Sequence, residues 1–264
     1  MMKKTSLIAI TALAALSAQA QLIDQWSFTD AVAPQNSDIQ GDTIGFWDPA
    51  LTGNSHDAGA GVLTWGYVPP EGAFKTSSSA FLGTTWLGQG SAIPQLVLTI
   101  DAKDINFSEN GGYGWEFTAG TGEITAGKVR SRITYFNGNV TMKMEGTGSE
   151  RSSTLLYSQA DYSSITDLQL TYTWDLVNNT MSMAANGSGI LTAGGTGNIT
   201  FSDTVAQDLT AVTNLRSFRT RQQGLGSSYM ELDTVTISAI PEPSAAALIG
   251  GALALASVMI SRRR

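Results

Sequence analysis

The sequence predicts an all-β protein, and two observations carry this prediction. Apolar and polar residues alternate with a period of two along many short segments, as in Asp167–Asp175, where Leu168, Leu170 and Trp174 share one face. Turns rich in glycine, serine and threonine separate these segments, and residues 21–239 contain no convincing amphipathic helix. Many short strands joined in this way are typical of a sandwich or a barrel.

The alternation predicts individual strands along the chain. The clearest segments are Gln95–Asp101, Lys128–Phe136, Val140–Glu145, Asp167–Asp175, Met181–Ala185 and Tyr229–Ala239. Weaker segments are Leu22–Phe28, Gly61–Val68, Tyr113–Thr118, Ser153–Tyr157, Ile199–Ser202 and Leu215–Arg221. The alternation slips between Leu232 and Val235, which predicts either a β-bulge at that point or burial on both faces of the strand.

Two hairpin turns are predicted from asparagine-containing pairs. Asn137-Gly138 joins two of the clearest strands, and both residue types tolerate the positive φ of a two-residue turn. A tight turn at Asn178-Asn179 is expected in the second hairpin. This second turn would place Trp174 opposite Met183 across the hairpin.

Residues 1–20 have the pattern of a secretory signal peptide. Lys3 and Lys4 form a basic start, Leu7–Leu16 is apolar, and Ala18 and Ala20 fill the small-residue positions of a cleavage site. A buried N-terminal helix is the alternative, which the charge on one side only disfavours. We therefore expect signal peptidase to cleave after Ala20 and the rest of the chain to be exported.

The C-terminal residues predict a membrane helix. The apolar run 245–260 follows two prolines and is broken only by Ser257. As a helix it would span roughly 24 Å at about 1.5 Å per residue, a little less than a hydrocarbon core of about 30 Å. An amphipathic or buried helix is the alternative, but the run has no polar face. Arg262, Arg263 and Arg264 follow it and would stay in the cytoplasm.

Residues 240–264 together resemble the PEP-CTERM sorting tail of Gram-negative bacteria, which has a Pro-Glu-Pro motif, a short transmembrane helix and terminal arginines. The motif here is Pro241-Glu242-Pro243. The resemblance implies that an exosortase-type transpeptidase recognises these residues and removes the helix. The protein would be anchored transiently in the inner membrane and then pass to the cell surface or the extracellular polysaccharide matrix.

The body, residues 21–239, is acidic and contains no cysteine. The chain has 15 Lys and Arg residues, of which five lie in the two ends, so 10 remain in the body. It has 22 Asp and Glu residues, of which Glu242 lies in the tail, so 21 remain. The body therefore carries a net charge of −11. This sign disfavours a nucleic acid or an anionic membrane as partner. Without disulfides, the exported domain has to be stabilised by its core or by a bound ligand.

Three segments of the body resemble laminin-G-like domains. Leu22–Phe28 is similar to their opening strand, Leu170–Met183 to their late hairpin, and Glu231–Ile237 to their closing strand, which pairs with the first. The resemblance implies a concanavalin-A-like jelly-roll sandwich of two antiparallel sheets. Lectins and glucanases share this fold class, so the fold alone does not decide the function.

Catalytic motifs are sparse in the sequence. Some glucanases of this fold class carry a Glu-x-Asp-x-(x)-Glu strand, and the nearest match, Glu231-Leu232-Asp233, lacks the last carboxylate because Val235 or Thr236 stands there. His56 is the only histidine, which excludes a site built from several histidines. The sequence therefore predicts a protein that is not an enzyme and has no catalytic residues, metal site or cofactor.

Structural calcium stays open as an alternative. Asp101 with Asp104, or Asp203 with Asp208, offers carboxylate oxygens of the kind that calcium takes. Neither pair has the spacing of a known calcium loop.

Aromatic residues are the remaining candidates for ligand contact. Trp65, Tyr67, Trp86 and Trp115 lie in the first half, mostly close to glycines, and exposed rings of this kind stack on sugars. The competing and favoured interpretation is that most of them belong to the core. The function expected from the sequence is thus a non-enzymatic protein of the cell surface or matrix. The alternatives are a carbohydrate-binding module and, with less support, a glycan hydrolase.

Overall fold

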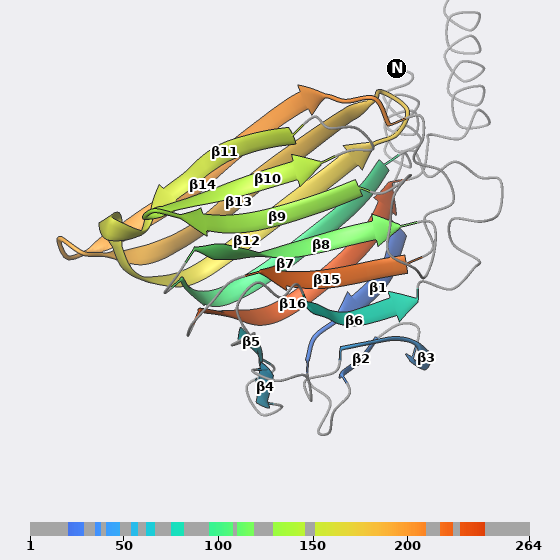
Figure 1. Ribbon diagram of the computed structural model, residues 1–264, viewed down its shortest axis with the longest axis horizontal. Helices are drawn as coiled ribbons and strands as arrows, with labels where there is room; N and C mark the ends of the chain where they lie inside the picture. Colours follow the sequence, from blue (N-terminus) through green and yellow to red (C-terminus); the bar gives the residue numbers. More distant parts are fainter. Residues whose placement is uncertain are drawn as a thin grey trace, which may run out of the picture.

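The computed structural model describes residues 21–28, 35–37, 41–47, 54–57, 62–66, 75–81, 95–107, 110–118, 129–145, 151–209, 217–223 and 228–240 of the 264-residue chain. These residues form two antiparallel sheets that lie face to face, with a small two-stranded sheet beside them (Figure 1). The all-β sandwich predicted from the sequence is confirmed.

The larger sheet has eight strands in the order β14-β13-β12-β7-β16-β5-β4, with β1 also paired to β16. Its strands are β1 (Gln21–Trp26), β4 (Asn54–Asp57), β5 (Val62–Gly66), β7 (Gln95–Asn106), β12 (Tyr162–Asp175), β13 (Thr180–Leu191), β14 (Thr196–Ala206) and β16 (Tyr229–Ile240). The first strand thus pairs with the last, as the resemblance implied. The ladder between β16 and β7 shifts between Leu232 and Thr234, which confirms the predicted bulge.

The smaller sheet has six strands in the order β11-β10-β9-β8-β15-β6. Its strands are β6 (Lys75–Phe81), β8 (Gly111–Thr118), β9 (Val129–Phe136), β10 (Asn139–Glu145), β11 (Arg151–Ser158) and β15 (Ser217–Gln223). β2 (Gln35–Ser37) pairs with β3 (Gly41–Trp47), and a short 3₁₀ helix, η1 (Gln159–Asp161), links β11 to β12.

The core lies between the inner faces of the two sheets. Alternate residues of β12 are buried and face aromatic residues of β8 in the other sheet. The Phe117 ring meets Trp174 edge-on with 5.4 Å between centroids, and Trp115 lies 6.2 Å from Tyr172. The Tyr172 hydroxyl donates a hydrogen bond to the backbone carbonyl of Arg132 across the sandwich at 3.0 Å. These contacts fix the stacking of the sheets, and large aromatic areas of this kind dominate the stability of such a core.

The two predicted hairpins are present, but only one has the predicted register. Asn137 and Gly138 both have positive φ and place Phe136 opposite Asn139, as expected for the two-residue turn. The second turn is longer, so Asp175 pairs with Thr180 and Trp174 with Met181.

The expected pairing of Trp174 with Met183 is therefore wrong by two residues. The physical reason is Asp175, whose Oδ1 accepts hydrogen bonds from the backbone N–H groups of Val177 and Asn178 at 3.1 and 2.8 Å. These bonds hold a four-residue turn in which Asn179 takes positive φ.

The proposed signal peptide and sorting tail lie outside the described residues. The described strands begin at Gln21 and end at Ile240. Among the described residues, no helix is long and apolar enough to cross a membrane.

Candidate functional site

A cavity of about 150 Å³ is lined by residues from the ends of β7 and β11 and the starts of β12 and β16. These strand ends lie at one end of the sandwich (Figure 1). Both sheets contribute to its walls. The lining residues are Asp104, Ile105, Asn106, Tyr157, Gln159, Tyr162, Ser163, Ser164, Ile165 and Tyr229. We refer to this cavity as the tyrosine pocket. It combines three phenol rings with one carboxylate, two side-chain amides and two hydroxyls.

Two of the tyrosines form one wall. Tyr157, close to the end of β11, is buried, and its ring meets that of Tyr162 edge-on with 5.5 Å between the centroids. Burial raises the pKa of Tyr157 above its ordinary value, and the nearby Asp104 and Tyr162 raise it further. The phenol therefore stays protonated and neutral at physiological pH, when it can donate and accept a hydrogen bond.

The third tyrosine is held against the carboxylate. The Tyr229 hydroxyl donates a hydrogen bond of 2.8 Å to Oδ2 of Asp104. This bond, followed by burial, raises the pKa of Tyr229. The bulged ladder between β16 and β7 sets Tyr229 opposite Asn106 and Glu231 opposite Asp104. The strand ends thus bring Asp104, Asn106 and Tyr229 together.

Gln159 supplies an acceptor that the described residues leave unused. Its Nε2 donates to the carbonyl of Phe107 at 2.8 Å, and its backbone N–H donates to the carbonyl of Gly138 at 2.8 Å. These bonds fix the side chain, but its buried Oε1 has no hydrogen-bond partner among the described residues. A buried acceptor without a partner costs free energy, which a water or a ligand hydroxyl in the pocket would recover.

The chemistry of the pocket suits a neutral ligand with several hydroxyl groups. Phenol rings offer apolar faces with a polar tip. The carboxylate accepts hydrogen bonds, and the amides and serine hydroxyls both accept and donate them. Over the described residues, no group of three or more His, Asp or Glu side chains is placed to hold a metal ion.

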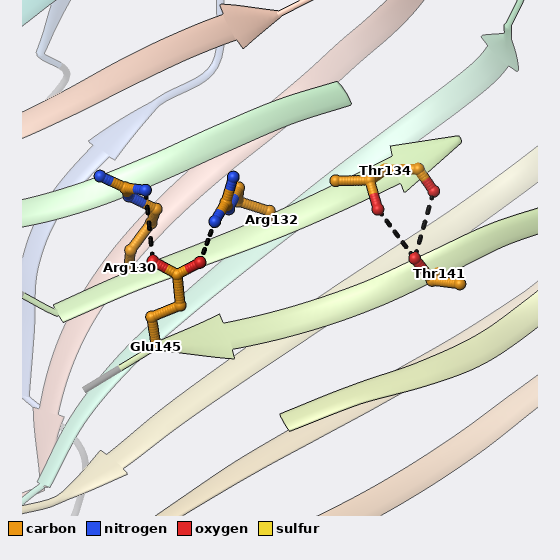
Figure 2. A network of polar contacts seen from close by, with 5 residues as sticks. All are labelled: Arg130, Arg132, Thr134, Thr141 and Glu145. Atoms are coloured by element: carbon orange, nitrogen blue, oxygen red, sulfur yellow. Dashed lines mark hydrogen bonds and ion pairs between the residues drawn. The ribbon is translucent and has the colours of Figure 1, made fainter. Parts of the chain in front are cut away.

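A second polar cluster lies on the outer face of the six-stranded sheet (Figure 2). Nη1 of Arg130 lies 3.2 Å from Oε2 of Glu145, and Nη2 of Arg132 contacts Oε1 of the same carboxylate. Further along the two strands, the hydroxyls of Thr134 and Thr141 are 2.8 Å apart. Glu145 pairs with Arg130 in the register of β9 and β10, which places it within reach of both guanidinium groups.

The aromatic residues proposed from the sequence do not form a common site in the described part of the chain. Trp115 is 0% exposed and packs against Tyr172, so the proposal that it stacks on a glycan is wrong. The reason is that Trp115 lies on the inward-facing side of β8, together with Tyr113 and Phe117. Trp65 lies on β5 opposite Met230, and Tyr67 and Trp86 fall outside the described residues.

The acidic residues proposed from the sequence have protein partners. The carboxylate of Asp233 lies 2.6 Å from Nζ of Lys103, and Asp101 accepts a hydrogen bond from Gln169 at 2.8 Å. Asp203 accepts a hydrogen bond from Thr154 at 3.3 Å, and Asp104 belongs to the tyrosine pocket. Whether calcium binds Asp101 with Asp104, or Asp203 with Asp208, stays a prediction.

Sequence reasoning missed the tyrosine pocket. Tyr157 and Tyr229 each stand at the boundary of a predicted strand, which was the only hint that they lie at an end of the sandwich. Their convergence depends on the strand order, because β11 and β16 belong to different sheets.

Comparisons with known proteins support the fold and leave the family open. No protein-family model matches the chain, and no curated protein matches it. Among solved structures, the CBM2 module of the evolved Dit protein of Lactobacillus casei BL23 phage J-1 matches with a TM-score of 0.54 and 9% identity, over 85% of this chain and 98% of that module. Arcelin-5, a lectin-like defense protein from Phaseolus vulgaris, matches with a TM-score of 0.49 and 8% identity, over 84% of this chain and 98% of that protein. The body has the concanavalin-A-like jelly-roll fold.

The comparisons correct one expectation. A Bacillus licheniformis β-glucanase also matches, with a TM-score of 0.43 and 10% identity over 84% of this chain and 97% of that enzyme. The expectation that the chain is not an enzyme is therefore contradicted, because glucanases are found among the similar structures beside lectins and a binding module. The missing carboxylate after Asp233 excluded one catalytic motif, and it did not exclude catalysis.

Proposed function

We propose that the β-sandwich binds carbohydrate in the tyrosine pocket. The observation that carries this proposal is the convergence of Tyr157, Tyr162 and Tyr229 with Asp104 and Gln159 at one end of the sandwich. Sugars present apolar C–H faces and many hydroxyl groups, and the pocket offers ring surfaces for the former and fixed acceptors for the latter. The similarity of the fold to a CBM2 module supports the proposal.

The pocket is small, which limits the ligand. A volume of about 150 Å³ lies below the roughly 300–1,000 Å³ of pockets that enclose drug-sized ligands. We infer that it takes one sugar unit, either as a monosaccharide or as the end of a chain.

The test is a glycan-array screen of the full chain in mild detergent, followed by calorimetric titration of the best ligand. Tyr162→Ala removes one ring wall, and we expect on the order of a tenfold or larger loss of affinity, which corresponds to about 1.4 kcal/mol. Tyr229→Phe removes the hydroxyl that donates a hydrogen bond to Asp104 and should weaken binding less. Val177→Ala is the control, because Val177 is exposed at the opposite end of the sandwich. Equal affinity of the wild type and Tyr162→Ala would refute the pocket as the site.

We propose further that this binding takes place outside the inner membrane, on the cell surface or in the extracellular matrix. The basic start and apolar run of residues 1–20 and the Pro-Glu-Pro, helix and arginine order of residues 240–264 support this proposal. The mature N-terminus would be Gln21, and an exosortase-type transpeptidase would act at Pro241-Glu242-Pro243.

Cell fractionation and mass spectrometry test the sorting proposal. Pro241→Ala combined with Pro243→Ala should leave the chain uncleaved in the inner membrane, because the recognition motif is lost. The single change Ser257→Ala inside the apolar run should leave sorting unchanged. Normal mass and surface location of the double variant would show that the motif plays no part.

A further inference from the structure

Basic residues occupy many positions in two adjacent rows of the six-stranded sheet, where the strand register sets them beside Arg130 and Arg132. Each row runs across β15, β8, β9, β10 and β11, and its members pair in register from strand to strand. The first row is Arg219, Glu116, Arg130, Glu145 and Arg151, and the second is Arg221, Gly114, Arg132, Lys143 and Ser153. We call these the basic rows.

The basic rows reverse the charge of the rest of the body. They hold six of the ten Lys and Arg residues of the body, against two of its 21 acidic residues. Their net charge is thus +4, while the body as a whole carries −11. Neighbouring strands lie about 4.8 Å apart, so charges repeat along each row at roughly this spacing or its double. Such a concentration on one face creates a local positive potential that attracts anions.

The central part of the basic rows is held rigid. Glu145 is buried and engages both Arg130 and Arg132, whose side chains are only 14% and 20% exposed (Figure 2). Arg132 lies over Gly114, where an added Cβ would come 3.1 Å from its Cγ. Because these guanidinium groups are ordered before any ligand arrives, binding loses less conformational entropy.

Glu145 also shows which anion fits. Each oxygen of its carboxylate contacts a different guanidinium group of β9, Oε2 that of Arg130 and Oε1 that of Arg132, and such charge-assisted contacts are stronger than those between neutral groups. A net charge of +4 remains after Glu116 and Glu145 are counted. The face is therefore complementary to further carboxylates arranged along it.

We propose that the basic rows bind a polysaccharide of uronic acids through its carboxylates. A nucleic acid fits less well, because double-stranded DNA carries one charge per about 1.7 Å and would be repelled by Glu116, Glu145 and the acidic remainder of the body. A polyuronate carries one carboxylate on each sugar, which is a sparser charge. This face is separate from the tyrosine pocket, so the proposal does not rest on the carbohydrate-binding function argued above.

The test measures binding of the full chain in mild detergent to polygalacturonate by calorimetry, at low salt and at about 0.15 M salt, where the Debye length is about 8 Å. Neutral dextran, dextran sulfate and a DNA duplex are run beside it. We expect binding to polygalacturonate that weakens with salt, and no binding to dextran. Tighter binding of dextran sulfate would overturn the carboxylate assignment, and tighter binding of DNA would overturn the assignment to a polysaccharide.

Two variants locate the binding on the basic rows. Arg132→Gln combined with Lys143→Gln removes two charges, and we expect at least a tenfold loss of affinity with an unchanged glycan profile of the tyrosine pocket. The control is Lys103→Gln, since Lys103 lies on the outer side of the eight-stranded sheet and is 46% exposed; its affinity should equal that of the wild type. Ser153→Lys, at an exposed position of the second row, adds one charge and should strengthen binding two- to fivefold. If the double variant, Lys103→Gln and Ser153→Lys all bound polygalacturonate with the affinity of the wild type, the proposal would be refuted. Ser153→Lys keeps this test valid even if the double variant is destabilised.

Discussion

The outer faces of the two sheets differ in chemistry although they belong to one sandwich. On the eight-stranded sheet, hydroxyl side chains meet across strands, as where Thr171 pairs with Thr99 and the Ser182 and Thr204 hydroxyls lie 2.9 Å apart. The six-stranded sheet instead presents the basic rows, with Glu145 set among arginines. The negative net charge of the chain thus does not describe the basic rows of the six-stranded sheet.

This difference limits what a net charge can exclude. The excess of acidic residues argues against an anionic partner only if the charges are spread evenly, and here six of the ten basic residues of the body share two rows of one face. The inner faces show no such contrast, because both are lined with apolar residues. Burial constrains the inner faces to be alike, and the outer faces are free to carry different functions.

The largest expected effect concerns the core that both sheets share. Trp174 is fully buried and contacts Phe117 of the opposite sheet, so Trp174→Ala should cost about 3–5 kcal/mol of unfolding free energy. Thr173→Ala changes the neighbouring residue, which belongs to the hydroxyl-bearing outer face, and should cost no more than about 0.5 kcal/mol. Urea melts of the two variants measure the difference. Equal midpoints would show that the faces of β12 are assigned wrongly.

The second largest expected effect concerns the Glu145 carboxylate of the basic rows. Glu145→Gln leaves two mostly buried guanidinium groups facing an uncharged side chain, and we expect a loss of about 2–4 kcal/mol, somewhat less than for a fully buried pair. Urea melts at two salt concentrations measure it. A loss below about 0.5 kcal/mol would mean that Glu145 does not hold the arginines in solution.

A carboxylate of the other sheet is held by neutral donors, which allows a sharper comparison. Burial alone would raise the pKa of Asp175, but hydrogen bonds from Asn178, Gln95 and Val177 outweigh it and lower the pKa below its ordinary value. A lowered folded-state pKa adds stability at pH above the unfolded-state value of about 3.9, and this stability is lost as the pH falls through the folded-state pKa.

Asp175→Asn should therefore cost about 1–3 kcal/mol at pH 7. The difference from the wild type should stay constant between pH 7 and about pH 5 and shrink below about pH 4. Thermal melts over this pH range measure it. A difference that grows on acidification would show that the pKa of Asp175 is raised in the folded protein.

The sequence predicted the parts of the molecule that follow from local pattern. Period-two alternation placed most strands, and the Asn137-Gly138 pair fixed the register of its hairpin because its two residues determine the turn. The register of the other hairpin was predicted wrongly, since the side chain of Asp175 closes that turn and adds two residues to it.

Both candidate binding surfaces depend on information that a local pattern lacks. Tyr157 and Tyr229 line the same cavity because β11 ends, and β16 begins, at the same end of the sandwich. Predicting this convergence requires the strand order. The basic rows require the register of β15, β8, β9, β10 and β11 together. Each of their charges looks isolated in the sequence, with a residue of the opposite face on either side.

The smallest expected effect concerns the ion pair of the eight-stranded sheet, which is the counterpart of the Glu145 cluster. Lys103 and Asp233 lie 2.6 Å apart, but their side chains are 46% and 39% exposed. Water and salt screen such a pair, and holding two exposed side chains together costs entropy, so its contribution is at most about 1 kcal/mol. Lys103→Ala should therefore lower the unfolding free energy by about 0–0.5 kcal/mol. A double-mutant cycle with Asp233→Ala, read from urea melts, isolates the coupling between the two charges. If this coupling free energy equalled the loss of unfolding free energy caused by Glu145→Gln, burial would not make the ion pairs of Glu145 stronger than the exposed pair of Lys103 and Asp233.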